Sequence, residues 1–201
     1  MFLMIDNYDS FTYNLYALFN QCGAEINIIK NDEFIGAEPY EGIIFSPGPS
    51  SPKNSGTTLR FISEYMGRKP LFGVCLGMQA LAYSLGYGIV RARTVKHGKL
   101  DEIAVTKKSV LFKNVPESFS AVRYHSLAVE IDERFITSRS KNDGTAMSIE
   151  DRKNKFFGVQ FHPESILSEF GGTIIRNFLD YAACCNSYPK CEEPISMGKN
   201  T

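Results

Sequence analysis

The stretch PLFGVCLGMQALAYSL, residues 70–85, decides the fold of this chain because its pattern changes at one residue. Its first part is short and apolar, as in a buried strand, whereas the part from Gln79 onward has the pattern of a helix. Cys75 stands at the junction, with Gly73 two residues before it and Gly77 two residues after it. Glycines on both sides are typical of a sharp strand-to-helix turn, which lifts its central side chain above the edge of a sheet.

A thiol at such a turn has two chemical advantages. The N-terminus of a helix favours the negatively charged thiolate, which is the reactive form of Cys75. The backbone N–H of Leu76 points to the place where an oxyanion would develop on a substrate. The sequence therefore predicts Cys75 as a nucleophile. The alternative is that Cys75 is a small buried apolar residue, as many free cysteines are.

The surrounding sequence predicts an α/β fold. Before the turn, apolar runs at 2–5, 25–30 and 42–45 alternate with amphipathic helical patterns at 11–22 and 59–66. Such alternation indicates a parallel sheet covered on both faces.

Beyond Gly88 the pattern changes to short strands in succession. We expect strands at 89–93, 102–106, 120–124, 127–131, 135–140, 146–149 and 156–161, and a closing helix at 172–185. The prediction is a central mixed, mostly parallel sheet flanked by helices, with extra antiparallel strands in the C-terminal half.

The composition narrows the class of protein. The chain has 201 residues and no formal net charge, which favours one domain and argues against a nucleic acid or an anionic membrane as partner. No apolar run approaches the roughly 20 residues of a membrane helix, and five cysteines without a CxxC pair argue against disulfides and a metal site. We expect a cytoplasmic domain at residues 1–186 and a polar tail or linker at 187–201.

A candidate base follows the last predicted strand. His162 comes directly after residues 156–161, at the sheet edge where sites form in α/β folds, and Glu164 is two residues further on. The sequence predicts a triad of Cys75, His162 and Glu164, because a nucleophile needs a base and a group that orients it. The alternatives are a histidine bonded to backbone and a glutamate that caps a loop.

Two other histidines and one loop carry further candidate groups. His125 lies between two predicted strands, and His97 lies in a basic segment that we interpret as an exposed turn. The loop SPGPS, residues 46–50, follows a predicted buried strand, so it lies at the same sheet edge. The N–H of Gly48, held by a proline on each side, is a candidate second oxyanion donor. The alternative is an ordinary surface loop.

Three motifs together resemble class I glutamine amidotransferases: GVCLGMQ at 73–79, SPGP at 46–49 and QFHPES at 160–165. IDNYDSFT at 5–12 and RYHSL at 123–127 are similar to the small subunit of anthranilate synthase and equally to the amidotransferase subunit of aminodeoxychorismate synthase.

The resemblance implies a flavodoxin-like three-layer fold and a reaction. Cys75 would attack the side-chain amide of glutamine, His162 would act as base and then as acid, and Glu164 would orient it. Gly48 and Leu76 would hold the oxyanion. The glutamine contacts implied by the resemblance are at six positions: Gly48, Pro49, Ser50, Gln79, Ser126 and Leu127.

The resemblance also implies a partner. Ammonia would pass to a larger chorismate-binding subunit, in tryptophan biosynthesis or, as the alternative, in folate biosynthesis. We expect no cofactor in this chain and Mg²⁺ only in the partner.

Met78 and Ser50 depart from the commonest pattern, which has histidine and glycine there, and we expect Ser50 to restrict the φ of its loop. Two rival functions are another cysteine hydrolase and a non-catalytic glutamine-binding regulatory domain.

Overall fold

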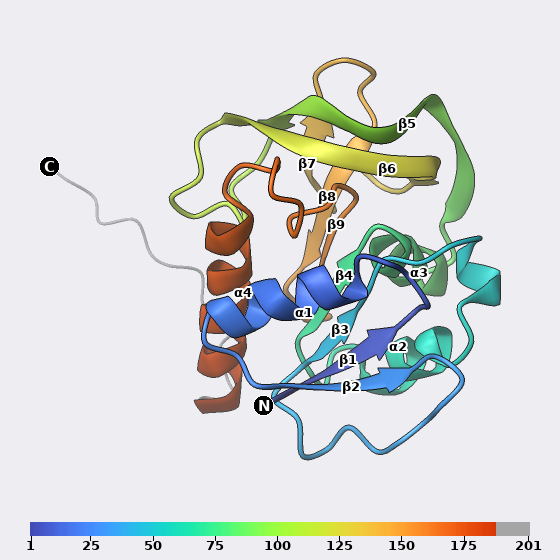
Figure 1. Ribbon diagram of the computed structural model, residues 1–201, viewed down its shortest axis with the longest axis vertical. Helices are drawn as coiled ribbons and strands as arrows, with labels where there is room; N and C mark the ends of the chain where they lie inside the picture. Colours follow the sequence, from blue (N-terminus) through green and yellow to red (C-terminus); the bar gives the residue numbers. More distant parts are fainter. Residues whose placement is uncertain (188–201) are drawn as a thin grey trace, which may run out of the picture.

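The computed structural model describes residues 1–187, and within them nine strands form one sheet (Figure 1). The strand order is β2-β1-β3-β4-β9-β8-β7-β5-β6. The parallel part consists of β1 (Phe2–Asp6), β2 (Ile26–Lys30), β3 (Ile43–Phe45), β4 (Leu71–Val74) and β9 (Phe156–Val159). The predicted mixed α/β sheet is therefore confirmed.

Helices cover both faces of the parallel part. α1 (Thr12–Gln21) and α4 (Gly171–Ser187) contact each other on one face (Figure 1). α2 (Thr58–Tyr65) and α3 (Leu76–Ser84) contact each other on the opposite face. The chain thus has the three layers expected from alternating strands and helices.

The two cores follow from the alternation of side chains along the strands. Met4 and Phe72 belong to the apolar cluster that includes α1 and α4, where the ring of Phe72 lies 5.0 Å from that of Phe178. Leu3 and Leu71, one residue earlier on the same strands, belong to the cluster on the α2 and α3 face. Strands that are apolar on both sides need a layer of helices on each face, because exposing either face to water would be unfavourable.

The C-terminal half adds four antiparallel strands: β5 (Gly88–Val105), β6 (Ser118–Glu130), β7 (Ile136–Ser140) and β8 (Ala146–Asp151). The sequence predicts residues 89–93 and 102–106 as separate strands, and also 120–124 and 127–131. This division is wrong, because each pair belongs to one continuous strand. The segment that joins the first pair is polar and largely exposed, so it shows no apolar alternation although its backbone pairs with β6.

The two remaining histidines lie in this paired region. His97 lies within β5 opposite Tyr124, so the predicted turn is wrong, although the residue is exposed as expected. Gly98, with φ of +66°, stands in an irregularity of the ladder there. His125 lies within β6 and not between two strands.

β9 completes the sheet by pairing with β4 on one side and β8 on the other. Val74 pairs with Val159, and the N–H of Cys75 donates to the Val159 carbonyl at 2.8 Å. The residues that follow β4 and β9 therefore leave the sheet side by side. The predicted tail begins at Ser187, but this residue is the last of α4, and residues 188–201 lie outside the described residues. Within residues 1–187, no helix is long and apolar enough to cross a membrane.

Candidate active site

Cys75 forms the turn between β4 and α3. Its φ of +52° and ψ of −103° are seldom adopted by L residues, and its side chain is only 6% exposed. The flanking glycines have a steric cause. A Cβ on Gly73 would lie 2.4 Å from the carbonyl carbon of Gly77, and a Cβ on Gly77 would lie 2.4 Å from the carbonyl oxygen of Phe45. The structure thus has the sharp turn that the glycine spacing predicts.

Replacing Gly77 by alanine should destabilise the fold by about 1–3 kcal/mol, because the new methyl group would overlap rigid backbone of β3. The free energy of unfolding in urea measures the effect. Gly172→Ala is the matched control, since its Cβ would come no closer than 3.6 Å to the flexible side chain of Arg176. Equal losses in the two variants would contradict a role for the close approach at Gly77.

His162 and Glu164 follow β9 and lie beside the turn. Nδ1 of His162 is 2.6 Å from Oε1 of Glu164, and both side chains are almost completely buried. The backbone N–H of His162 donates to the Val122 carbonyl of β6 at 2.9 Å, which holds this segment across the sheet edge. Among the described residues, Nε2 of His162 has no hydrogen-bond partner. Nε2 is the ring atom that a general base or acid would use.

The charge state of His162 depends on its two neighbours. Burial on its own lowers the pKa of His162, but the Cys75 thiol and the Glu164 carboxylate outweigh burial and raise that pKa to about 10. The ring therefore holds a proton at neutral pH. A thiolate beside an imidazolium is an activated nucleophile.

Two groups to which the sequence assigns no role contact the Cys75 sulfur. The side-chain amide of Gln160 donates to Sγ at 3.4 Å, and the carbonyl oxygen of Tyr124 lies 3.9 Å from Sγ. A local signal for Gln160 exists, because it precedes His162 by two residues in the same QFHPES motif. Tyr124 has no such signal, since its contact depends on where β6 crosses the sheet edge.

The loop at residues 46–50 packs against the turn. A Cβ on Gly48 would lie 2.4 Å from Cδ2 of Leu76, so the two predicted oxyanion donors are neighbours. Asn7 fixes the loop from β1: its N–H donates to Oγ of Ser46 at 2.9 Å, and its side-chain amide donates to the Ser46 carbonyl at 2.9 Å. Asn7 is a further residue that the sequence does not single out.

Ser50 continues this loop with φ of +71°, in the left-handed region that favours glycine. Its hydroxyl accepts a hydrogen bond of 3.0 Å from the side chain of Asn54, the last residue of the 3-10 helix η1 (Pro52–Asn54). Pro49 and Ser50 are exposed and Gly48 is partly exposed. These three predicted glutamine contacts therefore line the accessible side of the loop.

The other predicted glutamine contacts come from α3 and β6. Gln79 is almost completely buried, and its Nε2 donates to the Leu127 carbonyl and to Oε1 of Gln160, both at 3.1 Å. Ser126 is exposed and falls at the irregularity of the β5–β6 ladder, where Leu127 pairs with Arg91 but the next pair involves His125. The backbone of Ser126 therefore remains outside the regular ladder.

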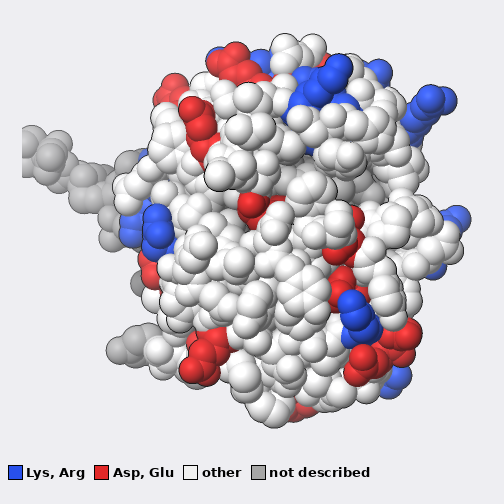
Figure 2. Space-filling view, viewed as in Figure 1, with Lys and Arg blue, Asp and Glu red and all other residues white. Residues whose placement is uncertain are grey.

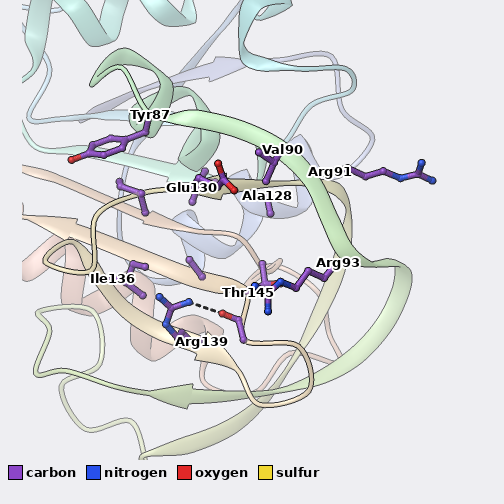
Figure 3. Close-up of a pocket in the computed structure, with 13 residues that line it drawn as sticks. Tyr87, Val90, Arg91, Arg93, Ala128, Glu130, Ile136, Arg139 and Thr145 are labelled. Atoms are coloured by element: carbon purple, nitrogen blue, oxygen red, sulfur yellow. Dashed lines mark hydrogen bonds between the residues drawn. The ribbon is translucent and has the colours of Figure 1, made fainter.

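A cavity of about 390 Å³ lies elsewhere, among β5, β6, β7 and β8 (Figure 3). Its lining includes Arg91, Arg93 and Arg139 but none of the predicted site residues. It is therefore separate from the Cys75 site. In the part of the chain that the structure describes, no group of three or more His, Cys, Asp or Glu residues could hold a metal ion.

Two buried histidines should give stability a maximum near pH 6.5. Burial and the Arg123 charge lower the pKa of His125 to about 4, so the unfolded chain binds the proton first and stability falls as the pH drops from 6.5 to 4. The pKa of His162 is raised to about 10, so the unfolded chain releases the proton first and stability falls as the pH rises from 6.5 to 10.

The free energy of unfolding, measured in urea across this pH range, checks both signs. His125→Asn should reduce the loss of stability between pH 6.5 and 4 only. His162→Ala should reduce the loss of stability between pH 6.5 and 10 only. An alkaline loss that is unchanged in His162→Ala would contradict the raised pKa of that ring.

Known proteins are similar to this chain in sequence and in fold. Residues 3–182 match the family model described as glutamine amidotransferase class-I. The chain is 43% identical over 188 residues to aminodeoxychorismate synthase component 2 of Klebsiella aerogenes, covering 90% of this chain and 100% of the relative. It is 40% identical over 187 residues to anthranilate synthase component 2 of Lactococcus lactis, covering 90% and 94%. The aminodeoxychorismate/anthranilate synthase component 2 of Bacillus subtilis is also 40% identical, with coverage of 90% and 96%.

A solved structure agrees with the fold. A Thermoplasma acidophilum protein described as a GMP synthase subunit superimposes with a TM-score of 0.84 at 21% identity, covering 94% of this chain and 96% of that one. At this identity the likeness concerns the fold, whereas the family follows from the sequence match over almost the whole described domain. The chain belongs to the class I glutamine amidotransferase family.

Proposed function

We propose that this chain is the glutamine amidotransferase subunit of anthranilate synthase, which hydrolyses glutamine and delivers ammonia to a chorismate-binding subunit. The observation that carries the proposal is the Cys75 thiol at a strand-to-helix turn beside the His162–Glu164 pair. The same role in aminodeoxychorismate synthase is the second candidate, because relatives of both names are 40–43% identical to this chain.

In the first half of the reaction, the Cys75 sulfur forms a bond to the side-chain carbonyl carbon of glutamine. The electrons of the C=O bond move to oxygen, where the N–H groups of Gly48 and Leu76 stabilise the negative charge. His162 then gives its proton to the amide nitrogen, the C–N bond breaks and ammonia leaves. The product on the enzyme is a γ-glutamyl thioester.

In the second half, water attacks the thioester carbon while His162 takes its proton. The C–S bond breaks, glutamate leaves and the thiolate of Cys75 is restored beside a protonated His162. The net reaction is glutamine plus water to glutamate plus ammonia, so no redox or metal cofactor from this chain is required. Mg²⁺ is expected in the partner synthase, and the setting is expected to be cytoplasmic.

Exposed apolar side chains near the site support the proposal that ammonia passes to another protein chain. Ile166 and Leu167, in the loop that follows His162, are 99% and 59% exposed, and Tyr13 at the start of α1 is 62% exposed. The face shown in Figure 2 is mostly uncharged, with a few acidic side chains near its middle and most Lys and Arg side chains toward its edges. Exposed apolar residues of this kind are typical of protein interfaces. We expect the synthase subunit to dock over this face.

Glutamate release from glutamine by the purified chain tests the proposal. The chain is assayed alone, with the large subunit of anthranilate synthase and with the large subunit of aminodeoxychorismate synthase. We expect the anthranilate partner to stimulate release. Stimulation by the other partner alone would favour the second candidate, and no release with either partner would contradict both.

A further inference from the structure

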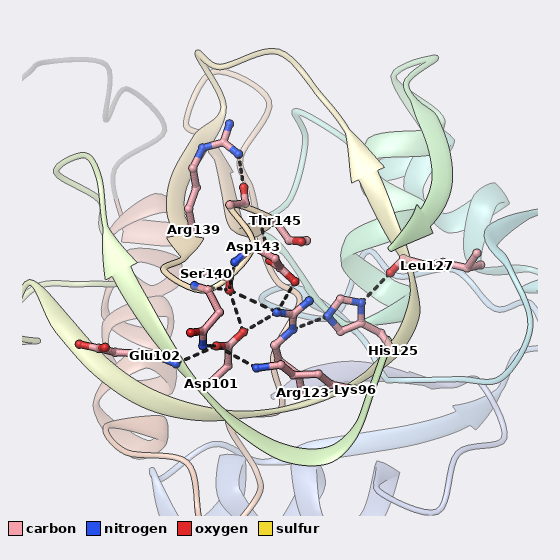
Figure 4. Close-up of polar contacts among 12 residues, drawn as sticks. Lys96, Asp101, Glu102, Arg123, His125, Leu127, Arg139, Ser140, Asp143 and Thr145 are labelled. Carbon is pink, nitrogen blue, oxygen red and sulfur yellow. Dashed lines mark hydrogen bonds and ion pairs between the residues drawn. The ribbon is translucent and has the colours of Figure 1, made fainter. Parts of the chain in front are cut away.

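A buried ion cluster lies close to residues 126–127 of β6, which are expected to contact glutamine (Figure 4). Arg123 is 0% exposed, and its Nη1 donates to Asp101 of β5, to Asp143 at 2.9 Å and to Oγ of Ser140 at 3.3 Å. Lys96 lies 3.0 Å from the other carboxylate oxygen of Asp101. Two cations and two carboxylates thus balance in charge, and the guanidinium group is held by two separate segments, β5 and the end of β7 with the turn that follows it.

Such a cluster serves a purpose other than stabilising the fold. Burying ions costs desolvation energy that their attraction seldom exceeds, so apolar residues of similar volume would serve a core at least as well. What the cluster does provide is a fixed guanidinium orientation. The Nε–H group of Arg123 therefore points in one fixed direction and can hold another group in place.

That group holds His125. Nε of Arg123 lies 3.0 Å from Nε2 of His125. Arginine can only donate, so Nε2 of His125 accepts and the single proton of the neutral ring lies on Nδ1. Nδ1 is 2.7 Å from the carbonyl oxygen of Leu127, to which it therefore donates. Arg123 selects the tautomer, and the tautomer fixes a backbone carbonyl two residues along β6.

The Leu127 carbonyl connects this pair to the nucleophile. It also accepts the hydrogen bond of 3.1 Å from Nε2 of Gln79. Gln79 in turn donates to Gln160, whose amide nitrogen donates to the Cys75 sulfur at 3.4 Å. A continuous series of hydrogen bonds therefore runs from the ion cluster to the thiol. It passes the Ser126–Leu127 backbone, which the ladder with β5 leaves irregular.

We propose that His125 is a positioning residue, held as the Nδ1–H tautomer by Arg123, which fixes the Ser126–Leu127 backbone for binding of glutamine. This inference rests on the proposed function, since it concerns the same substrate. It assigns no contact between His125 and the substrate: the ring acts through the Leu127 carbonyl. Its main effect is on substrate affinity, because the backbone segment contacts glutamine in ground state and transition state alike.

The electrostatic surroundings of the ring support the neutral form. Burial, the Arg123 charge and the nearby His162 lower the pKa of His125, while the Leu127 carbonyl and Asp143 raise it, and the balance is about 4. His125 therefore keeps one proton throughout the neutral range. A second proton would place a charge against Arg123 and remove the acceptor that its Nε–H uses.

Two variants separate the hydrogen bond from the volume of the ring. His125→Phe keeps a planar ring but cannot donate to Leu127, and we expect KM for glutamine to rise about 10- to 100-fold with kcat changed much less. His125→Asn places an amide N–H at the position of Nδ1 and should recover most of the affinity. His97→Phe, which changes an exposed histidine in the paired strand and keeps a ring against Tyr124, should leave KM unchanged.

An unchanged KM in His125→Phe overturns the proposal, as does a His125→Asn variant as weak as His125→Phe. A purely structural role would lower the amount of folded enzyme and leave KM as it is. The ¹⁵N spectrum of the histidines in the wild-type chain without glutamine gives a second test, independent of variants that fail to fold. We expect His125 to carry its proton on Nδ1, and a proton on Nε2 overturns the proposal even in an active enzyme. Absence of glutamate release by the wild type with either synthase would instead overturn the proposed function, whatever the tautomer.

Discussion

Cys75→Ser should abolish glutamine-dependent amine synthesis, with a loss on the order of 10⁴- to 10⁶-fold, and leave synthesis from added ammonium salt unchanged. A hydroxyl group does not ionise at neutral pH, so serine is a far weaker nucleophile than cysteine at this position. The backbone of the turn is retained because serine has nearly the same volume as cysteine. The measurement is product formation by the complex with its synthase, with glutamine or with ammonium as nitrogen source.

Cys22→Ser is the matched control for that variant. Cys22 lies at the end of α1 and donates to the Gly172 carbonyl at 3.5 Å, a hydrogen bond that a serine hydroxyl can also make. We expect full activity with both nitrogen sources. Glutamine-dependent turnover that survives in Cys75→Ser would show that another group is the nucleophile. Loss of the ammonium reaction would mean that the substitution impairs the synthase subunit itself, and the loss with glutamine would then not identify Cys75 as the nucleophile.

His162→Ala should reduce glutaminase activity by roughly 10⁴-fold or more, and Glu164→Gln should reduce it by a smaller factor, about 10- to 10³-fold. Alanine removes both the charge that stabilises the thiolate and the proton that the leaving nitrogen needs. Glutamine at position 164 can still accept the Nδ1–H hydrogen bond, although it loses the negative charge that raises the pKa of His162. Initial rates of glutamate release at saturating glutamine measure both effects.

Glu169→Gln provides the control in the same loop. Its carboxylate accepts the N–H of Ser120 at 2.7 Å and so fastens the loop to β6. We expect its activity to stay near that of the wild type. A loss in Glu164→Gln equal to that in His162→Ala would mean that the carboxylate does more than orient the ring. The assignment of Glu164 as a supporting residue would then be wrong.

The sequence predicts most of the architecture because its N-terminal half carries strong local signals. Apolar runs, helical periodicity and the glycines around Cys75 are all short-range features, and they correctly place β1, β3, β4 and the helices between them. The continuity of β5 is missed because its middle part is polar on both faces. Pairing with β6 makes it a strand, and pairing is a long-range property that no local pattern contains.

The site is partly predictable for the same reason. His162 and Glu164 are two residues apart, so their pairing follows from local geometry, and Gln160 precedes His162 by the same spacing. The Arg123 cluster is not predictable in this way, because its two carboxylates come from β5 and from the turn after β7. The tautomer of His125 depends in turn on that cluster. Its role becomes visible only when the four antiparallel strands are assembled.

The place of β9 between β4 and β8 has a consequence for biosynthesis. The Cys75 thiol lies in the first half of the chain and His162 follows the last strand, so the ribosome makes the proposed nucleophile long before the group proposed to activate it. A nascent or truncated chain that lacks β9 has a reactive position but no histidine beside it. We therefore expect hydrolysis of glutamine only after β9 has been made and has paired with β4. Glutamate release can then report that this pairing has formed.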